Sequence, residues 1–386
     1  MHSVLAGCDG DAATANDAGV AMDAPMMDDD AGCEPRETAA TDPALTAWRP
    51  TGTRITGAGD LPGSALPLRD AWRTMHGDTA NSDHAWVATA PMLELAWTVE
   101  TEFYIPEGPT FDNVGNLYFS PLFPREDVSL ISLNAETGER KWAISGDGTN
   151  AGSGAILVLD DPDEPGEQRI YHMSFTEAMA LRPDGTELWR VPTELEAPPD
   201  MVGVRPPTHS FGFNYHPQAD ALIGVTLGGD VLAFDRTTGA RLAPTVRLPG
   251  APAAMADVGL PPGVVEASNA LTDEVFGTAN GLSFFEVIID VLFGGGSQVT
   301  NYFGIDPNTG RIFIAATAED AADGTEDGVS ELGALYALEL VPEGPGAWTL
   351  AIVAETSFVG GTGSTPTIRA DGRRVYVSDN LGNLIT

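Results

Sequence analysis

Positive charge is scarce in this sequence. Lys and Arg together number 19 against 56 Asp and Glu, so the formal net charge is −37 at pH 7. A chain with this charge is repelled by the phosphates of nucleic acids and by the headgroups of anionic lipids. We therefore expect no nucleic-acid partner, and no membrane contact through a basic surface.

Cysteine is nearly absent, and long apolar runs are missing. The two cysteines are Cys8 and Cys33, both near the N-terminus, so the chain after residue 33 cannot form a disulfide bond within itself. No run of about 20 apolar residues occurs, which is the length that a membrane-spanning helix requires. The folded part is therefore expected to have no disulfide bond.

The composition is also poor for a helical bundle. Gly and Pro number 44 and 29, and both residues interrupt helices and favour turns. So many turn formers beside an ordinary apolar content are typical of a turn-rich all-β protein.

What the chain has instead is a repeated sequence motif, here called the first phrase. Residues 133–142 read LNAETGERKW, and variants are RPDGTELW at 182–189 and DRTTGARL at 235–242. Each variant follows a short strand pattern: VSLISL, EAMAL and GDVLAF, respectively. GALYALEL at 333–340, followed by VPEGPGAWTL at 341–350, is a looser copy with a longer turn.

A second phrase recurs ahead of the first. It reads PTFDNVGNLYFS at 109–120, FGIDPNTGRIFIA at 303–315 and PTIRADGRRVYVS at 366–378, and less clearly YHPQADALIGVT at 215–226. In each copy a strand pattern enters a polar turn and an alternating apolar strand follows, which is the pattern of a β-hairpin. Two hairpins per unit predict four short strands per repeat.

The glycines and tryptophans of the first phrase are interpreted as structural repeat residues. Gly138, Gly185 and Gly239 stand in polar turns, where a residue with positive φ is needed. Trp142 and Trp189 lie on the strands that follow and offer a large apolar surface between neighbouring sheets. The spacing from Trp142 to Trp189 falls within the ~40–50 residues of one propeller blade.

Both phrases resemble the PQQ-type β-propeller repeat, in which a strand ending in Ala/Leu-x-Asp/Asn is followed by x-x-Thr-Gly and then Trp. LNAETGERKW and FDRTTGARL match it best, and WRTMHGDTANSD at 72–83 is similar to the family's lead-in to the first blade. The third copy departs from the pattern, because Leu242 stands in place of Trp. The resemblance covers residues 71–386 and implies an all-β fold, a β-propeller of four-stranded blades.

About five blade-like units are recognised, near 91–145, 151–192, 207–250, 301–358 and from 363 onward. Members of the family usually have seven or eight. The last unit reaches DNLGNLIT, where a third strand, the turn and the Trp would follow. We therefore expect an incomplete ring with an exposed strand edge.

Residues 1–8 resemble the end of a bacterial lipoprotein signal. Leu5-Ala6-Gly7-Cys8 is similar to a lipobox, in which the cysteine is lipidated. The charged and apolar parts of a leader are missing ahead of it, so we expect the true start to lie upstream. The alternatives are a chance match and a Cys8–Cys33 disulfide. Residues 9–70 are expected to form a disordered acidic tether and lead-in, because their first part is rich in Asp, Ala and Met without an apolar period.

Residues 251–300 interrupt the repeat and are expected to form an insertion. Within them, LSFFEVIIDVLF at 282–293 would place Glu286 and Asp290 on one face of a helix and apolar residues on the other. Such a helix is a candidate lid or docking element. The alternatives are a segment packed on the propeller and a long blade strand.

Candidate catalytic groups are few. Resemblance to the quinoprotein dehydrogenases would imply adjacent cysteines over a quinone, a Trp beneath it, and Ca²⁺ held by Glu, Asn and Asp. No adjacent cysteines occur, so we expect no cofactor and assign no catalytic, cofactor-binding or metal-binding residue.

Histidines and acidic loops were weighed as further candidates. The histidine pairs are His76 with His84 and His209 with His216. No spaced Cys, Asp or Glu completes a metal motif around them, so packed or surface roles are favoured. The acidic stretches 160–168 and 318–328 resemble Ca²⁺ loops in composition alone, because the pattern ending in a bidentate Glu is missing. Solvated turns are the favoured interpretation.

The sequence thus predicts a non-catalytic, extracytoplasmic binding or scaffold propeller. It would be attached to a bacterial membrane only by a lipid on Cys8, on the periplasmic or outer side of the cell envelope. Its expected partner is another envelope protein or a small ligand. The alternative is a propeller enzyme, either a quinone-dependent dehydrogenase or a metal-assisted hydrolase or lactonase that uses the central channel.

Overall fold

The computed structural model describes the blade-forming part of the chain with some gaps. The described residues are 72–83, 95, 97–99, 105, 108–121, 128–145, 155–196, 210–253, 262–276, 278–279, 282–283, 298–344, 346–361 and 364–386. All of them belong to one compact unit, Gly52–Thr386. Cys8 and the whole of the expected tether, residues 9–70, lie outside the described residues.

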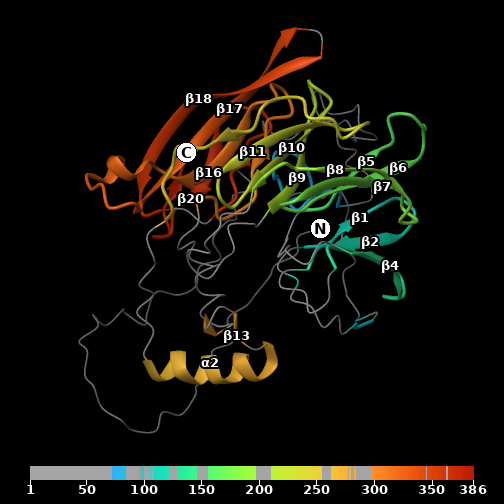
Figure 1. Ribbon diagram of the computed structural model, residues 1–386, viewed down its shortest axis with the longest axis horizontal. Coiled ribbons are helices and arrows are strands. Elements are labelled where there is room, and N and C mark those ends of the chain that lie inside the picture. The colour runs from blue at the N-terminus through green and yellow to red at the C-terminus, as the bar shows by residue number, and fades with distance from the viewer. Residues whose placement is uncertain are drawn as a thin grey trace, which may run out of the picture. The chain divides into compact units, whose positions relative to one another are not determined.

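The fold is all-β, as predicted, and is built from five antiparallel sheets that follow one another along the chain (Figure 1). Sheet 1 contains β1 (Thr110–Phe111), β2 (Asn116–Phe119), β3 (Leu130–Asn134) and β4 (Arg140–Ile144). Sheet 2 contains β5 (Leu157–Asp160), β6 (Gln168–Met173), β7 (Glu177–Leu181) and β8 (Glu187–Pro192). Sheet 3 contains β9 (Ser210–His216), β10 (Ala221–Thr226), β11 (Asp230–Asp235) and β12 (Val246–Arg247).

The last two sheets continue the series. Sheet 4 contains β15 (Gly304–Ile305), β16 (Ile312–Thr317), β17 (Leu332–Gly344) and β18 (Ala347–Val359). Sheet 5 contains β19 (Thr367–Ile368), β20 (Val375–Ser378) and β21 (Leu384–Ile385). In every sheet each strand pairs with the next in sequence, which is the meander of a propeller blade. The five blade-like units expected from the repeat are therefore present, with two hairpins in each of the first four.

Tight polar turns connect the third and fourth strands of sheets 1 and 3. Asn134 accepts hydrogen bonds on its side-chain oxygen from the N–H groups of Glu136 and Thr137, and on its carbonyl from Gly138. Gly138 has φ of 75° and Gly239, in sheet 3, has φ of 74°. Side chains adopt this left-handed region only at a cost, so glycine suits both turns.

The turn glycines of sheets 2 and 3, Gly185 and Gly239, also leave room for a tryptophan of the preceding repeat. A Cβ on Gly185 would lie 3.0 Å from Trp142, and one on Gly239 would lie 2.6 Å from Trp189. The indole N–H of Trp189 donates to the carbonyl of Arg236 in the same turn, at 3.2 Å. The tryptophan of one sheet is thus stacked on the turn of the next and hydrogen-bonded to it.

Trp97 makes the same contact with sheet 1, although it precedes the first sheet. A Cβ on Gly138 would lie 2.7 Å from its ring, and its indole N–H donates to the carbonyl of Ala135 at 3.2 Å. The first repeat therefore receives a tryptophan just as the second and third do.

The core lies between neighbouring sheets. Successive residues of a strand point to opposite faces, so Ile170 of β6 packs in a cluster with Tyr118 and Leu130 of sheet 1, whereas Tyr171 packs with Phe213 and other residues of sheet 3. A third cluster joins sheets 3 and 4. Full burial of such side chains contributes about 1.5–3 kcal/mol each.

Sheet 4 departs from the regular repeat. β17 and β18 are each 13 residues long, whereas β15 and β16 of the same sheet have two and six residues. At the position where the third repeat has Leu242 instead of Trp, the carbonyl of Leu242 accepts the N–H of Trp348 in β18 at 3.3 Å. The long hairpin thus supplies its own contact where the tryptophan is missing.

The stretch between β12 and β15 contains elements that the repeat does not have. α2 (Pro262–Phe276) begins with a proline, which is favoured in the first turn of a helix. The small hairpin of β13 (Thr278–Ala279) and β14 (Leu282–Ser283) follows it. The helix considered at 282–293 lies outside the described residues except for its first two, which are in β14. α2 itself was not predicted from the sequence.

Two glycine-to-alanine variants separate the stability that comes from the contact between glycine and tryptophan from the cost of placing alanine at positive φ. Gly239→Ala introduces both strain at φ of 74° and an overlap with Trp189, whereas Gly166→Ala adds strain at φ of 96° with nothing within 4 Å. We expect Gly239→Ala to lower the free energy of unfolding by about 2–4 kcal/mol and Gly166→Ala by about 1 kcal/mol. Chemical denaturation of both variants measures the difference, and equal losses would contradict a role for the tryptophan contact.

Candidate functional site

One segment contacts the first strand of every sheet. Residues 72–83, here called the central segment, precede the sheets in the sequence. Their backbone carbonyls accept hydrogen bonds from four strand N–H groups: Phe111 of β1 to Trp72 (2.7 Å), Val158 of β5 to Arg73 (3.0 Å), Ile305 of β15 to Thr79 (2.6 Å) and Ile368 of β19 to Ala80 (2.9 Å). The side chain of Asn214 on β9 supplies the fifth contact, to the carbonyl of Thr79 at 3.1 Å. The central segment therefore occupies the place where the five first strands meet.

The side chains of the central segment are held by the chain itself. Arg73 is buried and forms an ion pair with Asp160 at the end of β5, at 3.0 Å. Asp78 accepts hydrogen bonds from the N–H groups of Ala80 and Ser82 and from the Ser82 hydroxyl. Burial raises the pKa of Asp78 above its ordinary value, although these hydrogen bonds act in the opposite direction.

A chain of polar contacts runs from the central segment to sheets 4 and 5. Nδ1 of His76 lies 2.9 Å from a carboxylate oxygen of Asp83, and its Nε2 lies 3.3 Å from the hydroxyl of Thr365. That hydroxyl in turn donates to the side-chain oxygen of Asn301 at 2.8 Å. His76 also packs near the ring of Tyr302, with 6.1 Å between ring centroids.

The backbone of the central segment is strained on the C-terminal side of His76. Asn81 and Asp83 have φ of 57° and 50°, in the left-handed region that residues other than glycine seldom adopt. The N–H of Asp83 donates to the carbonyl of His76 at 3.1 Å, which closes the loop. Strain of this kind costs about 1–3 kcal/mol and is common at binding and catalytic sites. Because a carboxylate only accepts, Asp83 fixes the imidazole with its second nitrogen toward Thr365.

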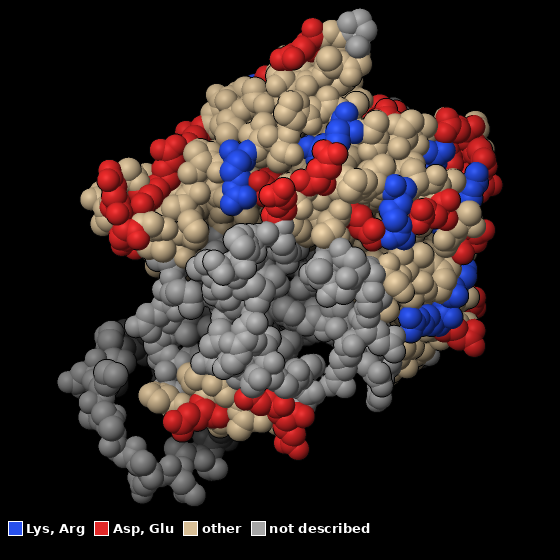
Figure 2. All heavy atoms as spheres, in the orientation of Figure 1, with Lys and Arg blue, Asp and Glu red and all other residues tan. Residues whose placement is uncertain are grey.

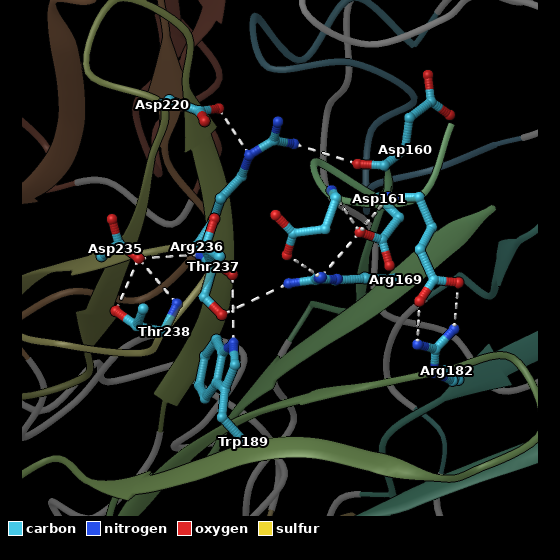
Figure 3. Close-up of polar contacts among 12 residues, drawn as sticks. Asp160, Asp161, Arg169, Arg182, Trp189, Asp220, Asp235, Arg236, Thr237 and Thr238 are labelled. Atoms are coloured by element: carbon cyan, nitrogen blue, oxygen red, sulfur yellow. Dashed lines mark hydrogen bonds and ion pairs between the residues drawn. The ribbon is translucent and has the colours of Figure 1, made fainter. Parts of the chain in front are cut away.

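A separate network of arginines and carboxylates joins sheets 2 and 3 at their turns (Figure 3). Arg236 donates to the carbonyl of Asp160 at 3.3 Å, and Arg169 donates to the carbonyl of Thr237 at 3.5 Å. Arg169 also pairs with the fully buried carboxylate of Asp161 at 2.8 Å. Burial acts to raise the pKa of Asp161, but the hydrogen bond and charge of Arg169 together with hydrogen bonds from the N–H groups of Asp163 and Glu164 lower that pKa, so the carboxylate remains charged. These contacts make the network a joint between sheets 2 and 3, although the Oδ2 of Asp161 and the Nε of Arg169 are buried without a hydrogen-bond partner.

Each histidine pair considered from the sequence has one member among the described residues, His76 in the first pair and His216 in the second. His216 ends β9 and accepts the N–H of Ala219 on its Nδ1, and burial lowers its pKa to about 4. His209 and His84 lie outside the described residues. His76 does take part in a polar cluster, but its partner Thr365 is 289 residues away in sequence, and no local pattern pointed to it.

His172 of β6 is a second site that the sequence did not reveal. Its side chain is fully buried, and neither ring nitrogen has a hydrogen-bond partner. Burial lowers its pKa to about 3, because the charged form is poorly solvated there, and Arg190 adds repulsion. A neutral, unpaired imidazole between sheets destabilises the fold, and it does so more strongly in acid.

The described part of the chain contains no group of three or more His, Cys, Asp or Glu residues placed to hold a metal ion. Of the helices in those same ranges, none has the length and apolar character needed to cross a bilayer.

No family model and no curated protein matches this chain. Similar solved structures include a quinohemoprotein alcohol dehydrogenase, ADHIIG, from Pseudomonas putida HK5, with 15% identity and a TM-score of 0.44, covering 87% of this chain and 49% of that one. BamB from Moraxella catarrhalis has 13% identity and a TM-score of 0.28, with 75% and 87% covered. A fission yeast complex of SREBP–SCAP binding domains has 12% identity and a TM-score of 0.35, with 79% and 68% covered.

This chain spans about half the length of the alcohol dehydrogenase, the first of these proteins. Similarity at these levels does not bear on what the chain does. The assignment of the fold therefore rests on the chain's own strand order and sheet packing.

The buried histidine predicts acid sensitivity. The folded-state pKa of His172, about 3, lies below the ordinary value near 6.5, so between these pH values the unfolded chain binds more protons. Protonation of His172 in the unfolded chain does not affect the free energy of unfolding above about pH 6.5. As the pH falls below that value, it lowers the free energy of unfolding by up to about 1.4 kcal/mol per pH unit. We expect His172→Leu to flatten the dependence of the free energy of unfolding on pH between about 6.5 and 4.5, measured by urea denaturation. Identical slopes in variant and wild type would show that the imidazole is solvated.

Proposed function

We propose that this chain is a non-catalytic binding platform of the cell envelope that engages another protein. The observation that carries this proposal is the central segment. A ligand at the meeting point of the first strands would have to displace hydrogen bonds made by all five sheets. Each such bond contributes about 0.5–1.5 kcal/mol, so the centre is better suited to holding the sheets than to admitting a ligand. Binding is then left to the outer strands and connections.

The proposal also assigns a role to the N-terminal residues. Cys8 would carry the lipid, and residues 9–70 would hold the sheets away from the membrane. A lipid anchor explains how so acidic a chain stays at an anionic surface, because acyl chains contribute about 0.8 kcal/mol per buried methylene group regardless of charge.

Cross-linking in the native envelope tests the platform. A photo-reactive residue is placed at exposed positions of different sheets, such as Thr186 in sheet 2 and Thr356 in sheet 4, with the buried Ala315 as the control. We expect at least one exposed position to give a single adduct of defined mass, in an amount that rises with the amount of this protein. We expect Ala315 to give no adduct. A chain that forms no adduct from any position at native abundance would rule the platform out.

A second candidate function is supported by the contacts of His76. A hydroxyl beside an imidazole that is oriented by a carboxylate is the arrangement of a nucleophile and its general base. The Thr365 proton turns from Asn301 to His76 by rotation of one bond, after which Thr365 can attack an ester or lactone carbonyl. His76 would pass the proton to the leaving alcohol, and water would release the acyl group. This candidate is a hydrolase that requires no metal.

The hydrolase candidate is tested with conservative changes at Thr365. If this candidate is right, the wild-type chain cleaves an activated ester or lactone, and Thr365→Ser keeps the activity. Thr365→Val reduces the rate at least about 100-fold, because valine keeps the shape of threonine but lacks the hydroxyl. Rates are followed by release of a chromogenic alcohol. No hydrolysis by the wild type, or equal rates in both variants, removes this candidate and leaves the platform untouched.

A further inference from the structure

The long hairpin of sheet 4 has no counterpart in the other described sheets. Its outer strand, β18, has 13 residues, whereas the outer strands β4 and β8 have five and six. The register pairs β17 with β16 only from Gly333 to Leu338, so the hairpin extends beyond the rest of its sheet. Figure 1 shows β17 and β18 reaching past β16 to an exposed tip.

The two halves of β18 have different surroundings. Near its start, the N–H of Trp348 donates to Leu242 of the neighbouring sheet, and Leu350 is buried. From Ile352 to Ser357 every residue is exposed, and β18 is the last strand in the order of sheet 4. Among the described strands none pairs with its outer side. Ile352, Val353 and Val359 expose 37%, 45% and 71% of their surface, so this stretch, Ile352–Val359, is both an open edge and an apolar one.

Proteins usually protect such edges with charges, proline or short length, because an open edge pairs with other chains. The outer strand β4 begins with Arg140 and Lys141, and β8 contains Arg190 and ends at Pro192. β18 contains one charged residue, Glu355, and its pairing with β17 has two irregularities of register, between Ala337 and Leu338 and between Pro342 and Gly344. The longest outer strand of the described sheets is thus the least protected.

The far end of this edge is strongly acidic. The connection between β16 and β17 contains the acidic residues Glu319, Asp320, Asp323, Glu326, Asp327 and Glu331. In the part of the chain that the structure describes, no Lys or Arg forms an ion pair with any of them or with Glu355. Burial and repulsion from Glu319 raise the pKa of Glu355. Figure 2 shows acidic side chains gathered at one end of the lobe that carries the hairpin, beside a largely uncharged surface.

We propose that Ile352–Val359 of β18 is a docking edge for an extended segment of a partner protein. The partner segment has alternating apolar residues, and it has Lys or Arg at the end that lies over residues 319–331. The segment would add a fifth strand to sheet 4. This proposal rests on the platform function and names its surface and the chemistry of its partner. Backbone hydrogen bonds along the edge give affinity, and the side chains give specificity.

The charges decide between this occupant and a second copy of the chain. Each copy has a formal net charge of −37, and pairing two β18 edges would bring together two acidic surfaces without a basic complement. A basic segment instead neutralises carboxylates that have no ion-pair partner among the described residues. Attraction of this kind is screened by salt, with a Debye length of about 10 Å at 0.1 M.

The test uses synthetic peptides and the full chain. Three labelled nine-residue peptides of alternating Val and Thr carry two Lys at the N-terminus, two Lys at the C-terminus, or two Glu, and binding is measured by fluorescence anisotropy at low and high salt. The chain variants are Ile352→Ser combined with Val353→Ser, Glu355→Lys, and Glu136→Lys. Glu136→Lys is the matched control, because it makes the same charge change at an exposed turn of sheet 1.

We expect one Lys peptide to bind with a Kd of about 10–100 µM at low salt, and which end carries its lysines gives the strand direction. The double serine variant and Glu355→Lys each weaken that binding at least about 10-fold, whereas Glu136→Lys leaves it unchanged. Near-ultraviolet circular dichroism shows that the variants remain folded.

Several results would overturn the proposal. They are equal binding of the Glu peptide, unchanged binding in the double serine variant, and no binding of any peptide at about 1 mM. A dimer in sedimentation that Glu355→Lys strengthens would identify a second copy as the occupant. If cross-linking captures a partner from another sheet while the peptides fail, the platform stands and the docking edge falls.

Discussion

Four backbone carbonyls of the central segment, those of Trp72, Arg73, Thr79 and Ala80, hold the first strands of all five sheets. The apolar clusters of the described residues otherwise join sheets that are neighbours in sequence, as in the units of a repeat protein. The central segment is the one described element that contacts every unit. Because those carbonyls bind strand N–H groups and a strand amide, they satisfy buried polar groups that would otherwise cost free energy.

The contacts between neighbouring sheets are of a second kind and repeat along the chain. A tryptophan stacks on the glycine of the next turn, and an apolar cluster fills the space between the sheets. The series is broken where Leu242 replaces the tryptophan, and there the long hairpin of sheet 4 contacts sheet 3 through Trp348. The departure from the repeat and the longest strands therefore occur at the same joint, and the hairpin that stabilises this joint also extends into solvent.

The centre and the outer edge differ in how far their polar groups are satisfied. In the centre, the carbonyls of Trp72, Arg73, Thr79 and Ala80 are paired with the first strands, although the Nε of Arg73 and the Oδ1 of Asn81 are buried without a hydrogen-bond partner. The polar contacts of His76 are the feature of the centre that offers chemistry. At β18 a strand edge that no described strand pairs with, exposed apolar side chains, and carboxylates without an ion-pair partner among the described residues lie together. A surface with open backbone groups, apolar area and charge gains free energy from a partner, whereas the carbonyls of the central segment are already occupied by the first strands. This contrast is the physical basis for favouring a platform over an enzyme.

The sequence by itself determined the fold class, the five units and the positions of their hairpins, because strand alternation, polar turns and glycine spacing are local properties that recur with the repeat. It also pointed to residues 72–83 as a lead-in, but not to their contacts. It missed α2, since that helix lies outside the repeat. Only the tertiary structure decided that His76 meets Thr365, that His172 is buried without a partner, and that β18 is an open edge. These features depend on segments far apart in the chain and on which faces remain uncovered, and neither is written in the spacing of nearby residues.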